Sequence, residues 1–303
     1  MLAAIPKRER ATFPVRRFEG LCARSVEDSV AAEEPLEIQL AFGNGEERRS
    51  KPISITMRTP GNDAELALGF LFSEGVIHDA DDVERISSSD DSAANGPGVP
   101  ERRCWAAKNA VKVDLAREKE LNLATLQRNF YTTSSCGVCG KASVLALRVA
   151  CPPRFEDSFQ IDAEMLYQVH ARLRAAQAIF HETGGIHSAA LFDRDGALRR
   201  IREDVGRHNA LDKLVGASLF EDELPLREQF LLLSGRASFE LMQKAVMAGI
   251  PLVAAVGAPS SLAIAVAKEF GITLIGFLRE DHFNVYHGTQ RLRVRCVMDC
   301  PAG

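Results

Sequence analysis

The chain has 303 residues, enough for about two domains, with 46% hydrophobic residues, 26% charged residues and a net charge of −4. The small net charge gives no overall field that would favour nucleic acid. No apolar run reaches the roughly 18 residues that a membrane helix needs, and no apolar stretch follows the basic N-terminus as in a secretory signal, so we expect a soluble, cytoplasmic protein.

The first half of the chain predicts a small α/β domain behind a basic arm. Residues 1–29 include the run PKRERATFPVRR, which is typical of a flexible, solvated arm. Apolar side chains alternate along residues 35–42 and 53–57 with Gly-Asn-Gly between them, which indicates a hairpin. A helix is expected over residues 62–75 and a further strand over residues 110–115.

A polar insertion and a change in sequence character set the predicted boundaries. Residues 88–104 contain too few apolar groups to offset the entropy of ordering, so we expect a disordered insertion there. The character changes over residues 140–155. We therefore predict an N-terminal domain over residues 30–145, a C-terminal domain over residues 146–292 and a tail from residue 293 to residue 303.

The second half of the chain alternates between strands and helices. A long amphipathic helix is expected from Asp162 to Gly184, then a hairpin over residues 187–204 and a short helix over residues 206–216. The later strands lie within FLLLSGR, PLVAAVGAPS and ITLIGFLRED, with helices between them. Nearly continuous apolar strands that alternate with helices predict an α/β domain whose mixed sheet is flanked by helices.

Two cysteines lie close together in TTSSCGVCGK, residues 132–141. Glycines after Cys136 and Cys139 remove side-chain restraint on the backbone. The residues after Lys141 favour a helix, so the helix dipole and the lysine both favour thiolate over thiol. A thiolate on a mobile loop suits nucleophilic sulfur chemistry.

Other roles for the pair remain open from spacing alone. Seven cysteines, an odd number in a long chain, argue for reduced thiols rather than a disulfide framework. A structural zinc site needs four ligands, and Cys296 and Cys300 form a second, more loosely spaced pair. A thioredoxin-like redox site and inert thiols are the remaining alternatives.

Three predicted strands end in residues suited to an anionic ligand. Ligands of open α/β sheets bind beyond the carboxyl ends of the strands, where backbone N–H groups and helix N-termini favour phosphate. The candidate residues are Ser234, Gly235 and Arg236; Gly257, Ser260 and Ser261; and Arg279, Glu280, Asp281 and His282. Each set alone is also an ordinary strand-to-helix turn, but the three together predict an anionic, nucleotide-like ligand.

The charged segment REDVGRHNALDK, residues 202–213, has two interpretations. One is a partly buried network of ion pairs or a subunit interface. The other places Arg207 and His208 in the ligand site. Counting charges does not separate them.

Deaminase chemistry is not expected. Zinc deaminases carry His-x-Glu and a later Pro-Cys-x-x-Cys. His187 is followed two residues later by Ala189, and the strand-to-helix turn SGRASFE contains no cysteine. The proton shuttle and the metal ligands would both be missing.

The ordered set of motifs resembles one family. The segments SSCGVCGK, TGGIHSAAL, REDVGRHNALDKLVG, LLLSGRASFELMQKA and GAPSSLAIAVA, with GITLIGFLR and FNVYH after them, are similar to the FdhD/NarQ family of formate dehydrogenase accessory sulfurtransferases. The resemblance covers roughly residues 30–292, apart from the insertion. It implies a small N-terminal α/β domain and a C-terminal domain similar to cytidine deaminase.

The resemblance also implies a role and a site. Such proteins take persulfide sulfur from a cysteine desulfurase and pass it to the molybdenum bis(guanine dinucleotide) cofactor that formate dehydrogenase needs. The persulfide position maps to Cys136, with Cys139 beside it. The cofactor-binding loop maps to Phe277, Leu278, Arg279, Glu280, Asp281 and His282.

Several expectations about ligands and partners follow from the resemblance. GDP is the expected analogue of the cofactor, and no structural metal is expected. The expected partners are a desulfurase, the catalytic subunit of formate dehydrogenase and a second copy of the chain, without nucleic acid or membrane. The alternative function is a non-catalytic cofactor chaperone whose cysteines bind zinc.

Overall fold

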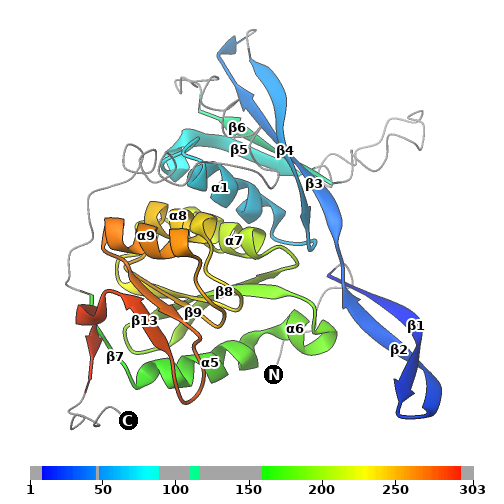
Figure 1. Cartoon of the computed structure of the whole chain (residues 1–303). Helices are drawn as coiled ribbons and strands as arrows, with labels where there is room; N and C mark the ends of the chain where they lie inside the picture. Colours follow the sequence, from blue (N-terminus) through cyan, green and yellow to red (C-terminus); the bar gives the residue numbers. More distant parts are fainter. Residues whose placement is uncertain (1–8, 46–47, 89–108, 117–158, 295–303) are drawn as a thin grey trace. The chain divides into compact units, whose positions relative to one another are not determined.

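The computed structural model describes residues 9–45, 48–88, 109–116 and 159–294 (Figure 1). The chain divides into two compact units, which are described separately. The first draws on residues 1–138, 178–187 and 203–223, and the second on residues 139–177, 188–202 and 224–303. The predicted domains were continuous in sequence, whereas residues 178–187 and 203–223 group with the N-terminal unit.

The first unit contains a four-stranded mixed sheet. Its strands are β3 (Glu34–Phe42), β4 (Arg49–Arg58), β5 (Val83–Ser88) and β6 (Ala110–Leu115), in the order β4-β3-β6-β5. The predicted hairpin is confirmed because β3 and β4 pair antiparallel, and β6 occupies the predicted range. The side chains of Leu36, Ile38 and Leu40 are buried, whereas the residues between them are half-buried.

Helices α1 (Asp63–Ser73) and α7 (Arg207–Phe220) pack against each other at two glycines. A Cβ atom on Gly69 would lie 1.8 Å from the backbone oxygen of Asp212, and one on Gly216 would lie 1.9 Å from that of Glu65. The helix predicted over residues 206–216 continues to Phe220 because Gly216 serves this close approach and does not end the helix. The 3-10 turn η2 (Ala80–Asp82) precedes β5.

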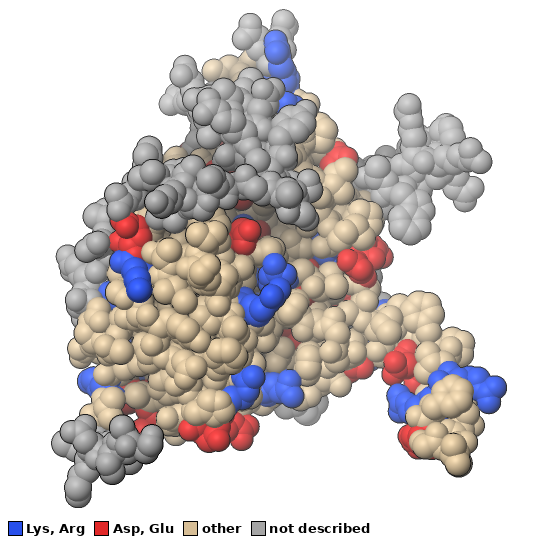
Figure 2. Space-filling view, viewed as in Figure 1, with Lys and Arg blue, Asp and Glu red and all other residues tan. Residues whose placement is uncertain are grey.

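The described part of residues 1–29, the predicted flexible arm, contains most of a β-hairpin. Strands β1 (Arg10–Glu19) and β2 (Cys22–Ala31) form an antiparallel hairpin with a tight turn at Gly20, whose φ is +62°. Val15 lies opposite Val26, and Arg17 and Arg24 form ion pairs with Asp28 and Glu19 respectively. Figure 2 shows basic and acidic side chains together on this hairpin. Most side chains of this hairpin are exposed or half-buried, so the sequence has no alternating buried face that would have predicted it.

The second unit is built on a six-stranded sheet in the order β13-β12-β11-β10-β8-β9. Strands β10, β11 and β12 are parallel, while β8 and β13 pair antiparallel with their neighbours β10 and β12. The strand bounds are β8 (His187–Asp193), β9 (Leu198–Asp204), β10 (Gln229–Leu233), β11 (Leu252–Ala255), β12 (Thr273–Gly276) and β13 (Asn284–His287). The predicted mixed sheet is confirmed.

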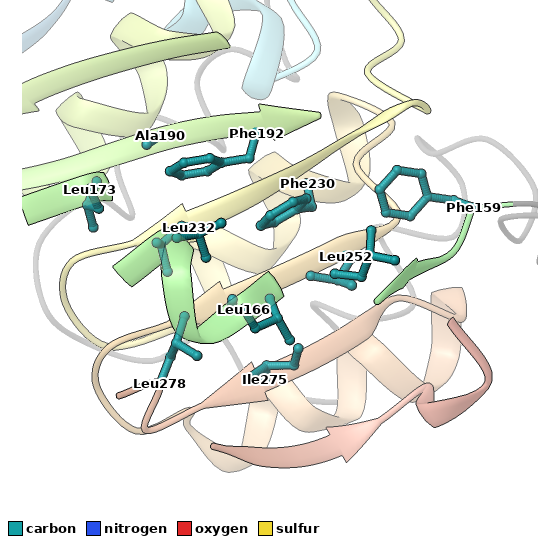
Figure 3. Close-up of a cluster of buried hydrophobic side chains, with 13 residues drawn as sticks. Phe159, Leu166, Leu173, Ala190, Phe192, Phe230, Leu232, Leu252, Ile275 and Leu278 are labelled. Carbon is teal, nitrogen blue, oxygen red and sulfur yellow. The ribbon is translucent and has the colours of Figure 1, made fainter. Parts of the chain in front are cut away.

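Helices cover both faces of this sheet. Figure 1 shows α8 (Phe239–Met247) and α9 (Ser261–Phe270) on one face and α5 (Met165–Ala176) on the other. Leu166 and Leu173 of α5 pack onto the sheet with Ala190, Phe192 and other apolar residues (Figure 3). This core fixes α5 against the sheet.

The long helix predicted from Asp162 to Gly184 is interrupted. It consists of α5 and α6 (Ala178–Thr183), separated by Gln177. Asp162 belongs to the short strand β7 (Ile161–Asp162), which pairs with β14 (Leu292–Arg293), and Glu164 is the N-cap of α5. The turn η4 (Thr289–Arg291) precedes β14. Within the described residues, no helix is long and apolar enough to cross a membrane.

Candidate functional site

The three predicted strand ends meet at one edge of the second unit's sheet. Because β10, β11 and β12 are parallel, the segments that follow them start at the same edge (Figure 1). The backbone N–H of Gly257 donates to the oxygen of Gly235 at 2.8 Å, and that of Phe277 donates to the oxygen of Gly257 at 3.1 Å. The structure therefore brings the three predicted segments together.

Close packing of these segments requires small residues. A Cβ atom on Gly257 would lie 2.9 Å from the backbone oxygen of Gly235 and 3.0 Å from the nitrogen of Arg236. A Cβ atom on Gly276 would lie 2.7 Å from Cδ of Pro259. The glycines allow the backbone segments to lie against one another at the sheet edge.

Two of the predicted serines have structural partners at this edge. Ser260 is the N-cap of α9, and its side chain accepts a hydrogen bond from the N–H of Ala263 at 3.2 Å. The hydroxyl of Ser234 accepts from the N–H of Ser188 at 2.8 Å. Ser261, the first residue of α9, and Arg236 are exposed. Arg236 thus presents a positive charge beside the strand ends.

The segment after β12 begins with an unusual backbone conformation. Phe277 has φ of +54°, a left-handed conformation that is rare for a bulky residue, and its side chain is 38% exposed. The next side chain, Leu278, is fully buried in the core shown in Figure 3. Leu278, although among the predicted binding residues, therefore has a packing role for its side chain.

The remaining residues of this segment form a fixed turn. Arg279 donates from Nη1 to the backbone oxygens of Val256 at 2.7 Å and Leu278 at 2.8 Å. The N–H of Arg279 donates to the oxygen of His282 at 2.9 Å. Asp281 and His282 pair at the surface, 2.6 Å apart, and Glu280 is exposed. The turn holds a guanidinium rigidly and leaves a carboxylate facing solvent.

Sequence reasoning missed the contribution of α5 to this region. The ring of Tyr167 lies 5.4 Å from that of Phe283, just beyond the turn. His170 is half-buried one helical turn later, and burial lowers its pKa. Glu280 opposes this shift, while Arg174 and Arg279 reinforce it. The sequence feature that could have indicated this contribution is a histidine at position 170, on the apolar stripe that Leu166 and Leu173 form.

Arg207 and His208 belong to the first unit, at the N-terminus of α7. Nearby Asp204 is fully buried and pairs with Lys213 at 2.7 Å. Asp204 also accepts from the N–H of Thr59 at 3.1 Å and from Nδ2 of Asn209 at 3.1 Å. For Asp204 and Lys213 the structure shows the buried ion pair that one of the two interpretations predicted.

The flank of this network includes two half-buried side chains, Arg207 and His187. Burial lowers the pKa of His187, the positive charge of Arg207 adds to that effect, and Asp204 opposes it. Nε of Arg207 is buried and has no hydrogen-bond partner among the described residues. Ligand binding by Arg207 and His208 stays a prediction.

The two predicted cysteine pairs, Cys136 with Cys139 and Cys296 with Cys300, lie outside the described residues. Most of the predicted insertion lies outside them as well. Within the described part of the chain, no group of three or more metal-binding side chains could hold a metal ion. The zinc alternative therefore stays open.

Residues 31–293 match the FdhD/NarQ family. The chain belongs to the FdhD/NarQ family. It is 52% identical over 272 residues to the sulfur carrier protein FdhD of Streptomyces avermitilis, covering 89% of this chain and 91% of the relative. The predicted family is thus confirmed.

Solved structures add evidence on the fold. A crystal structure described as a formate dehydrogenase accessory protein from Desulfotalea psychrophila matches 94% of this chain and 100% of its own, with a TM-score of 0.69 and 21% identity. This likeness shows a shared fold. Guanine deaminase from Nitrosomonas europaea matches 41% of this chain and 81% of its own, with 16% identity and a TM-score of only 0.29. The cytidine-deaminase-like domain stays a prediction.

Proposed function

We propose that this chain is a sulfur carrier for the maturation of formate dehydrogenase. It takes persulfide sulfur from a cysteine desulfurase onto Cys136 and passes it to a molybdenum bis(guanine dinucleotide) cofactor, its acceptor substrate. Family membership and similarity to relatives named sulfur carrier protein FdhD support the sulfur-carrying role. The choice of acceptor is supported by the edge of the second unit's sheet at which β10, β11 and β12 end.

The observation that carries the acceptor proposal is the convergence of three strand-end segments at this edge. Backbone N–H groups at the N-termini of α8 and α9 favour phosphate, and exposed Arg236 adds a charged donor. The exposed ring of Phe277 offers a flat apolar surface for a base. These features suit a large, anionic dinucleotide.

The sulfur chemistry needs two thiols and no redox metal on the carrier. The Cys136 thiolate attacks the terminal sulfur of the desulfurase persulfide, an S–S bond forms on Cys136, and the desulfurase cysteine leaves as a thiolate. The Cys139 thiolate then attacks Sγ of Cys136. A Cys136–Cys139 disulfide forms, and the terminal sulfur leaves at the oxidation level of sulfide for the acceptor. A thiol reductant restores both cysteines.

Persulfide loading provides the direct test. After incubation with a cysteine desulfurase and cysteine, mass spectrometry should detect one added sulfur atom on the wild type and on Cys139→Ala, but none on Cys136→Ala. Cys22, an exposed thiol in the described hairpin, supplies the matched control, and Cys22→Ala should load normally. Normal formate dehydrogenase activation by Cys136→Ala would exclude the mechanism. Bound zinc that is lost with either cysteine would instead favour the chaperone alternative.

The nucleotide half of the proposal is tested with GDP. Replacing Arg236 with alanine removes a charge-assisted hydrogen bond worth about 1.5–3 kcal/mol, so GDP affinity should fall by about ten- to a hundredfold. Loading of Cys136 should stay intact. Arg194 is an exposed arginine beyond the other end of β8, and Arg194→Ala should bind GDP normally. Equal GDP affinity in wild type and Arg236→Ala would remove Arg236 from the site.

A further inference from the structure

The hairpin of β1 and β2 has two outer edges, and its pairing shows which backbone groups face outward. These strands form a two-stranded sheet that pairs with no other strand of the described chain (Figure 1). The N–H of Ala32 donates to the oxygen of Glu9, directly opposite, at 2.9 Å. Hydrogen-bonded pairs alternate with non-hydrogen-bonded pairs in an antiparallel ladder. The even-numbered residues of β1 and the odd-numbered residues of β2 therefore point their backbone groups away from the hairpin.

The two outer edges differ by a proline. Pro14 occupies an outward position of β1, where it supplies no N–H and interrupts that edge. Proline commonly protects an exposed edge from strand pairing. The outward residues in the middle of β2 include no proline, and their outward backbone groups have no hydrogen-bond partner among the described residues; they are Ala23, Ser25, Glu27 and Ser29. Strand β2 thus presents an uninterrupted edge to a further strand.

One face of the hairpin is apolar but lacks a covering layer among the described residues. Val15 lies directly opposite Val26, and both side chains are half-buried. Phe13 and Val30 share this face and are 52% and 40% exposed. An isolated two-stranded hairpin is marginally stable in water, whereas three or more strands with an apolar face are stable. Additional strands would therefore stabilise this hairpin.

The charges on the same face are self-complementary. Arg17 lies directly opposite Arg24, a pairing of like charges that is unfavourable in a sheet. Their ion pairs with Asp28 and Glu19 involve largely exposed side chains and contribute little. Two arginines and two carboxylates favour neither a strongly acidic nor a strongly basic partner. In an antiparallel second copy of β2 centred on Val26, Asp28 of one copy would lie opposite Arg24 of the other.

We propose that the outer edge of β2 pairs antiparallel with β2 of a second copy of this chain, about a two-fold axis at Val26. Residues 25 and 27 then exchange backbone hydrogen bonds between the copies, as do residues 23 and 29. The four strands form one sheet in the order β1-β2-β2-β1, with Val15 and Val26 of both copies in one row. Each Arg24 gains an opposite charge, as expected of a self-complementary two-fold interface.

Proline substitutions on the two edges give a matched test. Ser25→Pro removes an outward N–H from β2, and Thr12→Pro removes one from β1. Both are exposed hydroxyl residues at non-hydrogen-bonded positions, so the ladder within the hairpin keeps its hydrogen bonds. Sedimentation velocity over a range of concentrations measures association. Ser25→Pro should raise the dimer dissociation constant at least about tenfold, whereas Thr12→Pro should leave it unchanged.

Charge reversal tests the predicted pairing of Arg24 with Asp28. Arg24→Asp and Asp28→Arg each place like charges opposite one another on both sides of the axis, so each should weaken self-association about tenfold. An equimolar mixture of the two variants should form a heterodimer, because every carboxylate then lies opposite an arginine. Arg16→Asp, on the other face of the hairpin, is the control and should associate like the wild type.

Disulfide trapping tests the register. In a chain whose native cysteines are replaced by serine, Val26→Cys should crosslink two copies under mild oxidation with oxidised glutathione. Residues opposite one another in a non-hydrogen-bonded pair lie about 4.5 Å apart, within the reach of a disulfide. Val15→Cys is the control, because its two copies would be separated by three strand spacings, roughly 14 Å.

Several results would overturn pairing through β2. A monomeric wild type would do so and would leave the β2 edge to a different protein. An unchanged dimer in Ser25→Pro, or equal losses in Ser25→Pro and Thr12→Pro, would also exclude the β2 edge. Crosslinking of Val15→Cys but not of Val26→Cys would contradict the register. Persulfide loading of Cys136 is a separate measurement, so each of these failures leaves the sulfur-carrier proposal intact.

Discussion

The tripeptide Arg-Glu-Asp occurs twice in this chain, at residues 202–204 and 279–281, with opposite structural outcomes. In the first copy, Glu203 accepts hydrogen bonds from the N–H groups of Ile179 and Phe180, and Asp204 is fully buried against Lys213. In the second copy, Glu280 and Asp281 are both exposed. Identical local chemistry therefore gave a structural network in one unit and a solvent-facing turn in the other.

The two copies differ in the polar groups that surround each carboxylate. Taking a carboxylate out of water is costly unless a cation and several hydrogen-bond donors replace the water. Asp204 has both the cation, Lys213, and several hydrogen-bond donors, so its carboxylate stabilises the fold. Glu280 has none among the described residues and stays exposed to water.

The largest effect is expected from breaking the buried pair of the first copy. Lys213→Met leaves Asp204 buried without its cation, and it also removes the donor to the backbone oxygen of Thr59. Loss of one partner of a buried pair typically costs about 3–5 kcal/mol of unfolding free energy. Urea denaturation followed by circular dichroism measures this change.

A surface lysine provides the control for that variant. Lys112 pairs with Asp114 at 3.2 Å, but it is substantially exposed. Lys112→Met should cost at most about 1 kcal/mol, because exposed ion pairs contribute little. Similar losses in the two variants would mean that the buried network is not the main support of this unit.

A second effect is expected where α7, the helix that carries Lys213, meets α1. Gly69→Ala would place a methyl group within bonding distance of the Asp212 backbone, so the two helices must separate. Overpacking of this kind typically costs about 1–3 kcal/mol. Gly185→Ala is the matched control because the nearest atom to its added methyl group is 3.8 Å away. Equal thermal melting temperatures for the two variants would contradict the close helix contact.

The sequence predicted much of the second unit and less of the first. Apolar runs located β10, β11 and β12, because burial on both faces leaves a continuous apolar signal. The order of these strands then implied that Arg236, Gly257 and Phe277 would share an edge. The hairpin of residues 10–31 was missed because it has no continuous core to impose a clear pattern.

The site was predictable only where residues follow strands. His170 lies on another element, and the place of that element, α5, beside the segment after β12 depends on how α5 packs across the sheet. Likewise, the burial of Asp204 depends on Thr59, far away in sequence. The charge pattern identified the charged residues of segments 202–213 and 279–282. Only tertiary packing determined that the first segment forms a buried network and the second an exposed turn.

A pH effect should follow from Glu203. Burial raises its pKa, although hydrogen bonds from the backbone of Ile179, Phe180 and Ala178 and the charge of His181 oppose the shift. A carboxyl with a raised pKa contributes stability that is fully present below its unfolded value near 4.5 and is lost as pH rises through the folded value. Glu203→Gln should therefore lose less stability than the wild type as pH rises from about 4.5.

Denaturation midpoints at several pH values measure the Glu203 effect. Burial also raises the pKa of Glu9. Part of the loss of stability with rising pH should therefore remain in the Glu203→Gln variant. Glu228→Gln, at an exposed carboxylate, should follow the wild-type curve. An unchanged slope in Glu203→Gln would assign the pH dependence to other groups.

The smallest effect on stability is expected at the second copy of the tripeptide. Glu280→Gln and Asp281→Asn change exposed side chains, so the unfolding free energy should shift by no more than about 0.5 kcal/mol. By contrast, Asp204→Asn, the equivalent change to Asp281→Asn in the first copy, should destabilise strongly because it removes the charge opposite buried Lys213. A large loss of stability in Glu280→Gln would show that its carboxylate supports the fold. In that case, the contrast between the two copies would fail.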